Sequence, residues 1–125
     1  MSVPTDLKYT AEHEWIRVEG DEVVVGVTDF AQGELGDVVF IEIETEGETL
    51  SKGETFGTIE AVKTVSDLYM PVDGEVIEAN SALEDTPELV NSEPFEGGWM
   101  IRIKLSDPSQ LEDLMGTEEY NALIG

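Results

Sequence analysis

The sequence contains no cysteine among its 125 residues and a single histidine, His13. The lack of cysteine excludes disulfide bonds, thiolate metal sites and cysteine nucleophiles, and it fits a reducing compartment. His13 has no second histidine or cysteine with which to complete a metal site or a nucleophile–base pair. We therefore expect His13 to pack in a loop and assign it no catalytic role.

Long apolar runs are absent too. No segment of the chain approaches the roughly 20 apolar residues that a membrane-spanning helix needs. The first six residues, MSVPTD, have neither the basic nor the apolar region of a secretory signal or a transit peptide. We therefore expect a soluble, cytoplasmic protein with no membrane partner.

Basic residues are scarce. Six lysines and arginines stand against 29 aspartates and glutamates, which gives a formal net charge of −23. Nucleic acids and anionic membrane surfaces would repel such a chain. Disorder is a common result of this acidity, but a hydrophobic content of 40% in alternating patterns indicates a folded core. Our hypothesis for the charge is adaptation to high salt, as in a halophile, because salt screens self-repulsion.

Enzyme motifs are missing from the chain. It has no G-x-S-x-G, Walker A, H-E-x-x-H or EF-hand pattern. Its carboxylates are so numerous that choosing two of them as a general acid and base would be arbitrary. We therefore expect a protein that is not itself an enzyme.

What the sequence does contain is a β-rich pattern of a length that suits one domain, residues 1–125. Apolar alternation predicts strands near residues 7–9, 15–18, 23–27, 37–43, 75–78 and 99–105. In the fourth of these, Val39 should share a face with Ile41. In the last, Trp99 should face the core and Met100 should face solvent.

Helices are expected to be short. One should run from Thr28 or Asp29 to Leu35, and Gly36 should end it. A second should begin at Thr86, and residues 107–124 should form a helical C-terminal extension that opens with a capping box. The segment 45–54, which is rich in Glu, Gly and Thr, is predicted to be a surface loop.

The most informative pattern is GTIEAVKTVSDLYMPVDGEV, residues 57–76. Apolar alternation leads up to Lys63, and a second alternating run leads away until Pro71 ends it. This predicts a β-hairpin with Lys63 at its tip. Neither Lys63 nor Thr64 favours a tight turn, so we expect packing of the flanking Val62 and Val65 to hold the tip.

A lysine at the end of a stiff hairpin presents an amine on a flexible stem, and that amine can be acylated. An ordinary solvated surface lysine is the simpler interpretation of the strand pattern alone. The scarcity of basic residues favours a specific use for Lys63, but the pattern leaves both interpretations open.

The chain resembles the glycine cleavage system H-protein family along nearly all its length. The lipoyl-lysine motif of that family is matched by EAVKTVSD, residues 60–67, and the following P-x-x-G-E-V stretch by residues 71–76. Ala61 and Thr64 depart from the residues more usual in the family, but neither changes the lysine. Further matching segments are residues 9–15 (YTAEHEW), 26–32 (GVTDFAQ), 35–40 (LGDVVF) and 98–101 (GWMI).

The resemblance implies a mainly β fold, the lipoyl-type barrel-sandwich hybrid of two antiparallel sheets with short helices. It implies lipoic acid in amide linkage to Lys63, and a carrier that is not a catalyst. The implied partners are a pyridoxal-phosphate (PLP)-dependent glycine decarboxylase, a tetrahydrofolate-dependent aminomethyltransferase, dihydrolipoyl dehydrogenase and a lipoate ligase or transferase. Glu14 and Asp67 match positions near the cleft that shelters the loaded arm in the family, and Glu12 lies close to them in sequence.

Three alternatives remain at this point. The chain could pass lipoate on to 2-oxoacid dehydrogenases, or it could be an interaction module in which Lys63 stays a free amine. Biotin carriage is disfavoured because a Met-Lys-Met tip is replaced by residues 62–64, VKT. A monomer is the expected state.

Overall fold

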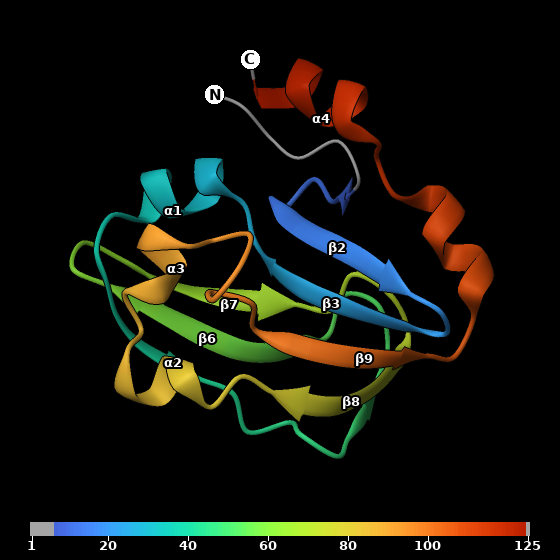
Figure 1. Ribbon diagram of the computed structural model, residues 1–125, viewed down its shortest axis with the longest axis horizontal. Coiled ribbons are helices and arrows are strands. Elements are labelled where there is room, and N and C mark those ends of the chain that lie inside the picture. Colours follow the sequence, from blue (N-terminus) through green and yellow to red (C-terminus); the bar gives the residue numbers. More distant parts are fainter. Residues whose placement is uncertain (1–6, 125) are drawn as a thin grey trace.

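The computed structural model describes residues 7–124. Two antiparallel sheets form the body of the molecule, and short helices lie around them (Figure 1). The elements are β1 (Lys8–Tyr9), β2 (Glu14–Glu19), β3 (Glu22–Val27), α1 (Asp29–Leu35), β4 (Val38–Glu42), β5 (Thr49–Leu50), β6 (Thr55–Ala61), β7 (Val65–Tyr69), β8 (Gly74–Ala79), α2 (Ala82–Asp85), α3 (Leu89–Ser92), β9 (Ile101–Leu105), the 3-10 helix η1 (Pro108–Asp113) and α4 (Thr117–Ile124).

The larger sheet has the strand order β1-β2-β3-β9-β8-β5, and the smaller has the order β4-β6-β7. This confirms the predicted fold class of two antiparallel sheets with short helices and a C-terminal helix. The helices α1, α2 and α3 gather at one end of the sheets, where the turn between β6 and β7 also lies (Figure 1). None of the helices within residues 7–124 has the length and apolar character needed to cross a bilayer.

The main core lies between the two sheets, where both contribute buried side chains such as Val25, Ile103, Ile59 and Leu68. A second, smaller cluster covers the other face of the larger sheet. Its buried residues are Leu7, Tyr9, Trp15, Val24 and Tyr120. Because β3 is buried on both faces, its sequence is a continuous apolar run rather than an alternation.

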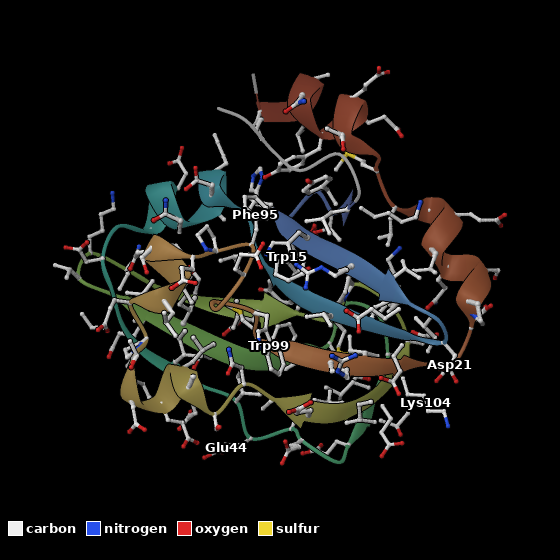
Figure 2. All side chains as sticks on the ribbon, viewed as in Figure 1. Trp15, Asp21, Glu44, Phe95, Trp99 and Lys104 are labelled. Atoms are coloured by element: carbon white, nitrogen blue, oxygen red, sulfur yellow. The ribbon has the colours of Figure 1, made fainter. Side chains whose placement is uncertain are left out.

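The helix α4 contributes Tyr120 to this second cluster, stacked on Tyr9 with ring centroids 4.6 Å apart. Trp15, Phe95 and Trp99 lie on the same side of the sheet (Figure 2). The indole N–H of Trp15 donates to the carbonyl of Pro94 at 2.7 Å. Leu123, on the same helix, is 51% exposed and is not part of this cluster.

Gly26 leaves the space that the Trp15 ring occupies. A Cβ atom at Gly26 would lie 2.7 Å from three ring atoms, and the indole cannot retreat without losing its bond to Pro94. We expect Gly26→Ala to lower the free energy of unfolding by about 1–3 kcal/mol through overpacking. Urea unfolding measures the change. Gly33→Ala in α1, which meets no atom within 4 Å, is the control and should be neutral or stabilising by up to about 1 kcal/mol; equal losses in both variants would contradict the prediction.

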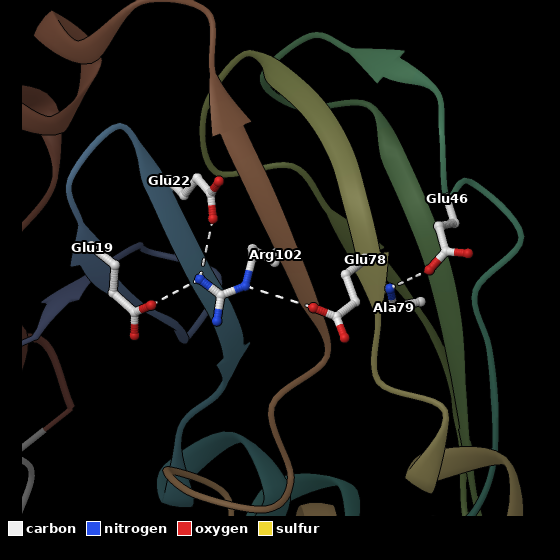
Figure 3. A network of polar contacts seen from close by, with 6 residues as sticks. All are labelled: Glu19, Glu22, Glu46, Glu78, Ala79 and Arg102. Atoms are coloured by element: carbon white, nitrogen blue, oxygen red, sulfur yellow. Dashed lines mark hydrogen bonds and ion pairs between the residues drawn. The ribbon is translucent and has the colours of Figure 1, made fainter.

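The outer side of the larger sheet carries a charge network centred on Arg102 (Figure 3). The Arg102 guanidinium lies 2.8 Å from Glu19, 3.3 Å from Glu22 and 3.7 Å from Glu78, so one cation on β9 contacts carboxylates from three other strands, β2, β3 and β8. These side chains are partly exposed, so water and salt screen each pair and its contribution to stability is small. Arg102 therefore serves mainly to offset local repulsion between acidic strands.

The strand β4 departs from the predicted alternation. Val39 is 49% exposed, whereas Val38 and Ile41 are buried. A β-bulge shifts the register of β4 against β6 between Val38 and Phe40, so one residue is left out of the alternation. The prediction that Val39 shares a face with Ile41 is wrong for this reason.

The approach to β9 also differs from expectation. Met100 is fully buried in the main core, and Trp99 packs against the second cluster instead. Because β9 begins at Ile101, the two-residue period does not extend back to these positions. The Met100 backbone is fixed separately, by donation of its N–H to the carbonyl of Val25 at 2.8 Å.

Two predicted helix starts need correction. Thr86 ends α2 instead of beginning the next helix, and α3 starts at Leu89. Asp107 caps η1 as predicted, but Gln110 does not complete a capping box. Its side-chain oxygen accepts the backbone N–H of Asp73 at 2.6 Å, which is a long-range contact. Within the predicted loop 45–54, β5 forms two pairs with β8.

Candidate functional site

Lys63 lies at the tip of the β6–β7 hairpin, as predicted. The two strands pair as far as Glu60 with Val65, and the backbone N–H of Ala61 donates to the carbonyl of Thr64 at 2.8 Å. The Lys63 side chain is exposed. It forms no hydrogen bond or ion pair with any residue in the part of the chain that the structure describes. Its amine is therefore available to an incoming reagent.

The tip is not held as predicted. Val62 is 73% exposed and Val65 is 63% exposed, so the flanking valines do not pack against the body. The support comes from residues 36–38, which connect α1 to β4 and which we call the corner. The backbone N–H of Val62 donates to the carbonyl of Asp37 at 2.9 Å, and a Cβ atom on Gly36 would lie 3.2 Å from Cε of Lys63.

Gly36 therefore has two roles in the corner. Its φ of 82° is a left-handed conformation that favours glycine, and it ends α1 as the sequence predicts. Its missing side chain also leaves room for the methylene stem of Lys63. The sequence signals the first role but not the second, because the contact joins residues from separate elements.

A surface hollow of about 490 Å³ runs beside β7, next to the hairpin tip. It brings together Glu14 and Asp67, for which the family resemblance implies a place near an arm cleft, and Glu12, which lies close to Glu14 in sequence. Asp67 is exposed on β7, whereas Glu14 is only 4% exposed. From Val65 to Tyr69 the strand advances about 13 Å, so the hollow extends away from the tip along a substantial part of β7.

Glu14 is the unusual carboxyl group of this hollow. Tyr69 donates its backbone N–H to Glu14 Oε2 at 3.2 Å, and the Thr10 hydroxyl donates to Oε1 at 3.3 Å. Burial raises the pKa of Glu14 to about 8, and the charge of Glu12 adds to the rise, although the two hydrogen bonds oppose it. At neutral pH the group is therefore mostly a neutral carboxylic acid, which can donate as well as accept a hydrogen bond.

The buried Glu14 also lines a second hollow, of about 370 Å³. Apolar atoms of Met70, Pro71 and Leu114 line this hollow, together with the charged Lys52. Glu14 thus lines both the acidic hollow along β7 and a more apolar hollow next to the end of η1. Sequence reasoning could not distinguish Glu14 from Glu12, since nothing in the local pattern shows which of the two is buried.

His13 takes a packing position, as expected. Its ring lies 4.7 Å from that of Phe30, and its Nδ1 is 2.9 Å from the Tyr120 hydroxyl. The same hydroxyl lies 2.6 Å from the Thr28 hydroxyl, so His13 helps to attach α4 to the sheet. Among residues 7–124, no group of three histidine or acidic side chains is arranged to hold a metal ion.

Comparison with known proteins places these features in a family. The family model described as glycine cleavage H-protein matches residues 7–125. The chain is 54% identical over 125 residues to the glycine cleavage system H protein of Staphylococcus saprophyticus, covering 100% of this chain and 99% of that protein. It is 59% identical over 124 residues to that of Bacteroides thetaiotaomicron, covering 99% of this chain and 98% of that protein.

A solved structure agrees with the sequence relatives. The crystal structure of a glycine cleavage system H protein from Mycobacterium marinum superposes with a TM-score of 0.89 at 38% identity. The match covers 98% of this chain and 99% of that one, so the whole arrangement of sheets and helices is shared. The chain therefore belongs to the glycine cleavage H-protein family.

Proposed function

We propose that Lys63 carries lipoate in amide linkage and that the chain is the lipoyl carrier of the glycine cleavage system. The observation that carries the proposal is the exposed, unpaired amine of Lys63 on a hairpin tip supported from one side. The residues fit the group, because the tip leaves the amine open to acylation and the hollow beside β7 offers a surface along which a long arm can lie.

The modification is an acyl transfer to Nζ of Lys63. In its neutral form Nζ attacks the carbonyl carbon of a lipoyl adenylate, which a lipoate ligase makes from lipoate and ATP. The C–N bond of the amide forms, the bond from the carbonyl carbon to the phosphate oxygen breaks, and AMP leaves. Starting from the ammonium form, Nζ releases two protons in total, one before the attack and one as the amide forms.

The carrier role needs little chemistry from the chain itself. The dithiolane of lipoate supplies the sulfur that holds an aminomethyl group and the two-electron redox couple. The chain presents this arm in turn to a PLP-dependent decarboxylase, an aminomethyltransferase and dihydrolipoyl dehydrogenase, which are its proposed partners. Lys63 provides the flexible attachment, and the stiff hairpin limits where the arm can reach.

Glu14 and Asp67 are proposed to hold the loaded arm in the hollow beside β7. An aminomethyl group is cationic at neutral pH, and the exposed carboxylate of Asp67 can pair with it. A cation beside Glu14 would favour the carboxylate over the acid, so the proton on Glu14 would leave as the cation arrives. Glu14 would then provide a buried partner, and Asp67 an exposed one.

Intact mass separates this proposal from its alternatives. Purified chain is incubated with a lipoate ligase, lipoate and ATP, and we expect the mass increase of one lipoyl amide, mapped by peptide analysis to Lys63. No increase would mean an interaction module with a free amine. If the loaded chain passes lipoate to a 2-oxoacid dehydrogenase but does not support glycine decarboxylation, the chain is a lipoyl donor instead.

Cytoplasmic location, a monomeric state and adaptation to high salt belong to the same proposal and rest on composition. The named relatives do not support a halophilic origin, so the net charge of −23 is the only basis for the hypothesis of adaptation to high salt. We expect the melting temperature to rise between about 0.1 and 1 M KCl, because the Debye length falls from about 10 to about 3 Å. Thermal melts followed by circular dichroism measure this, and an unchanged melting temperature would remove the hypothesis.

A further inference from the structure

Asn91, on the short helix α3, holds the corner between α1 and β4 with all of its side-chain polar atoms. Its Oδ1 accepts the backbone N–H of Val38 at 2.8 Å. Its Nδ2 donates to the carbonyl of Gly36 at 2.9 Å and to the side-chain oxygen of Gln32 at 2.8 Å. A single amide therefore ties the end of α1 to the start of β4.

This corner is also the support of the hairpin tip. Asp37, between the two backbone groups that Asn91 binds, accepts the N–H of Val62. Gly36, whose carbonyl Asn91 binds, lies under the stem of Lys63. Together these contacts connect α3 to the tip through the corner at residues 36–38. Since Val62 and Val65 are exposed, hydrophobic packing does not replace this support.

We infer that Asn91 is a positioning residue for the acylation of Lys63, acting through the corner at residues 36–38. The inference rests on the proposed lipoylation of Lys63. An acylating enzyme must bring Nζ to within about 3–3.5 Å of the reacting carbonyl carbon, and a misplacement of about 1 Å can cost 100-fold in rate. A more mobile hairpin tip would less often reach that geometry on the acylating enzyme, although the Lys63 amine would be as nucleophilic as before.

The test substitution is Asn91→Asp. The carboxylate still accepts from Val38, but it loses both N–H donors and places negative charge against the Gly36 carbonyl. We expect kcat/KM for lipoylation by a lipoate ligase, with lipoate and ATP, to fall about tenfold or more. The rate of acetylation of Lys63 by a small reagent, read by peptide mass analysis, should stay within about twofold, since small reagents need no docked tip.

The chain provides a matched control in Asn80. Its Nδ2 likewise makes two hydrogen bonds, here both to backbone carbonyls, those of Gly97 and Trp99 at 2.9 and 2.8 Å, and its Oδ1 accepts the backbone N–H of Ala82. Asn80→Asp removes two donated hydrogen bonds from a half-buried loop asparagine whose side-chain partners, Gly97, Trp99 and Ala82, lie outside residues 36–38. We expect its kcat/KM for lipoylation to stay within about twofold of the parent chain.

Hydrogen exchange gives a readout that does not depend on lipoylation. The amide of Val62 should exchange about tenfold faster in Asn91→Asp and at the parent rate in Asn80→Asp, because only the first loosens its acceptor at Asp37. If Asn91→Asp does not fold, Gln32→Ala removes one acceptor of the same amide. It should then raise Val62 exchange and lower kcat/KM by about two- to threefold.

The outcomes separate the inference from the function on which it rests. If the parent chain gains no lipoyl group, the proposed function fails. If the parent is lipoylated and Asn91→Asp is lipoylated at the same rate, with Val62 exchange unchanged, the inference is wrong. Equal losses in Asn91→Asp and Asn80→Asp would also overturn it, because they would show a general effect of loosening the fold.

Discussion

The Lys63→Arg variant is expected to gain no mass from a lipoate ligase and to lower glycine decarboxylation in a reconstituted system to the level measured without carrier. Arginine keeps the positive charge and the length of the side chain. Its guanidinium stays protonated at all accessible pH values and does not attack an acyl adenylate. The variant therefore removes the acceptor amine while leaving the hairpin, the corner and the hollow in place.

The control for this loss is Lys104→Arg. Lys104 is exposed on β9, at the opposite end of the molecule from the β6–β7 turn (Figures 1 and 2). This variant should gain one lipoyl group and support decarboxylation as the parent does. Lipoylation of Lys63→Arg at another lysine, with retained decarboxylation, would contradict the assignment of the attachment site. Loss of mass gain in both variants would point to a general effect of lysine replacement.

The position of Lys63 at a hairpin tip could be predicted from the sequence, because the residue pattern that indicates it lies on both sides of the lysine. Strand alternation has a period of two residues, so Ile59 and Ala61 indicate a buried face running up to the turn, and Leu68 indicates it again on the return. Pro71 then marks the end of the second strand. The tip follows from where these two runs meet, without knowledge of the rest of the fold.

The contacts that hold that tip could not be predicted from the sequence. The hydrogen bond from Val38 to Asn91 joins residues 53 positions apart, and no local pattern reports it. The exposed Val62 and Val65 were misjudged because apolar residues beside a turn are typical of packing. In the structure, backbone hydrogen bonds and one asparagine side chain hold the turn, which leaves the valines free at the surface next to Lys63.

The sequence also does not show which acidic residues are buried. Charge counting gives the net value of −23, but it cannot say which carboxyl groups lose contact with water. Glu14 lies at the start of β2 and is buried, while Glu12, two residues earlier, is exposed. The difference depends on long-range packing, such as the approach of β7, whose Tyr69 donates its backbone N–H to Glu14, and burial is the main cause of the raised pKa of Glu14.

Glu14→Gln is expected to stabilise the fold by about 3 kcal/mol at pH 7. Burial raises the pKa of Glu14 to about 8 from the ordinary value of 4.5, and each pKa unit corresponds to about 1.4 kcal/mol. Glutamine has no charge to bury, its oxygen can accept from Tyr69, and the Thr10 hydroxyl can turn to accept from its amide group. Urea unfolding of parent and variant measures the difference.

The sign of the pH dependence follows from the raised pKa. Below about pH 4.5 Glu14 is protonated in both states, so parent and variant should differ little. Between about pH 4.5 and 8 the unfolded chain loses the proton that the folded chain keeps, so the parent loses stability relative to Glu14→Gln as pH rises. Glu12→Gln removes one exposed charge from the same hollow but keeps the buried Glu14 carboxyl, so its difference from the parent should change much less with pH. A constant difference between parent and Glu14→Gln from about pH 4 to 9 would show that Glu14 titrates normally and that the hollow beside β7 has no neutral acid.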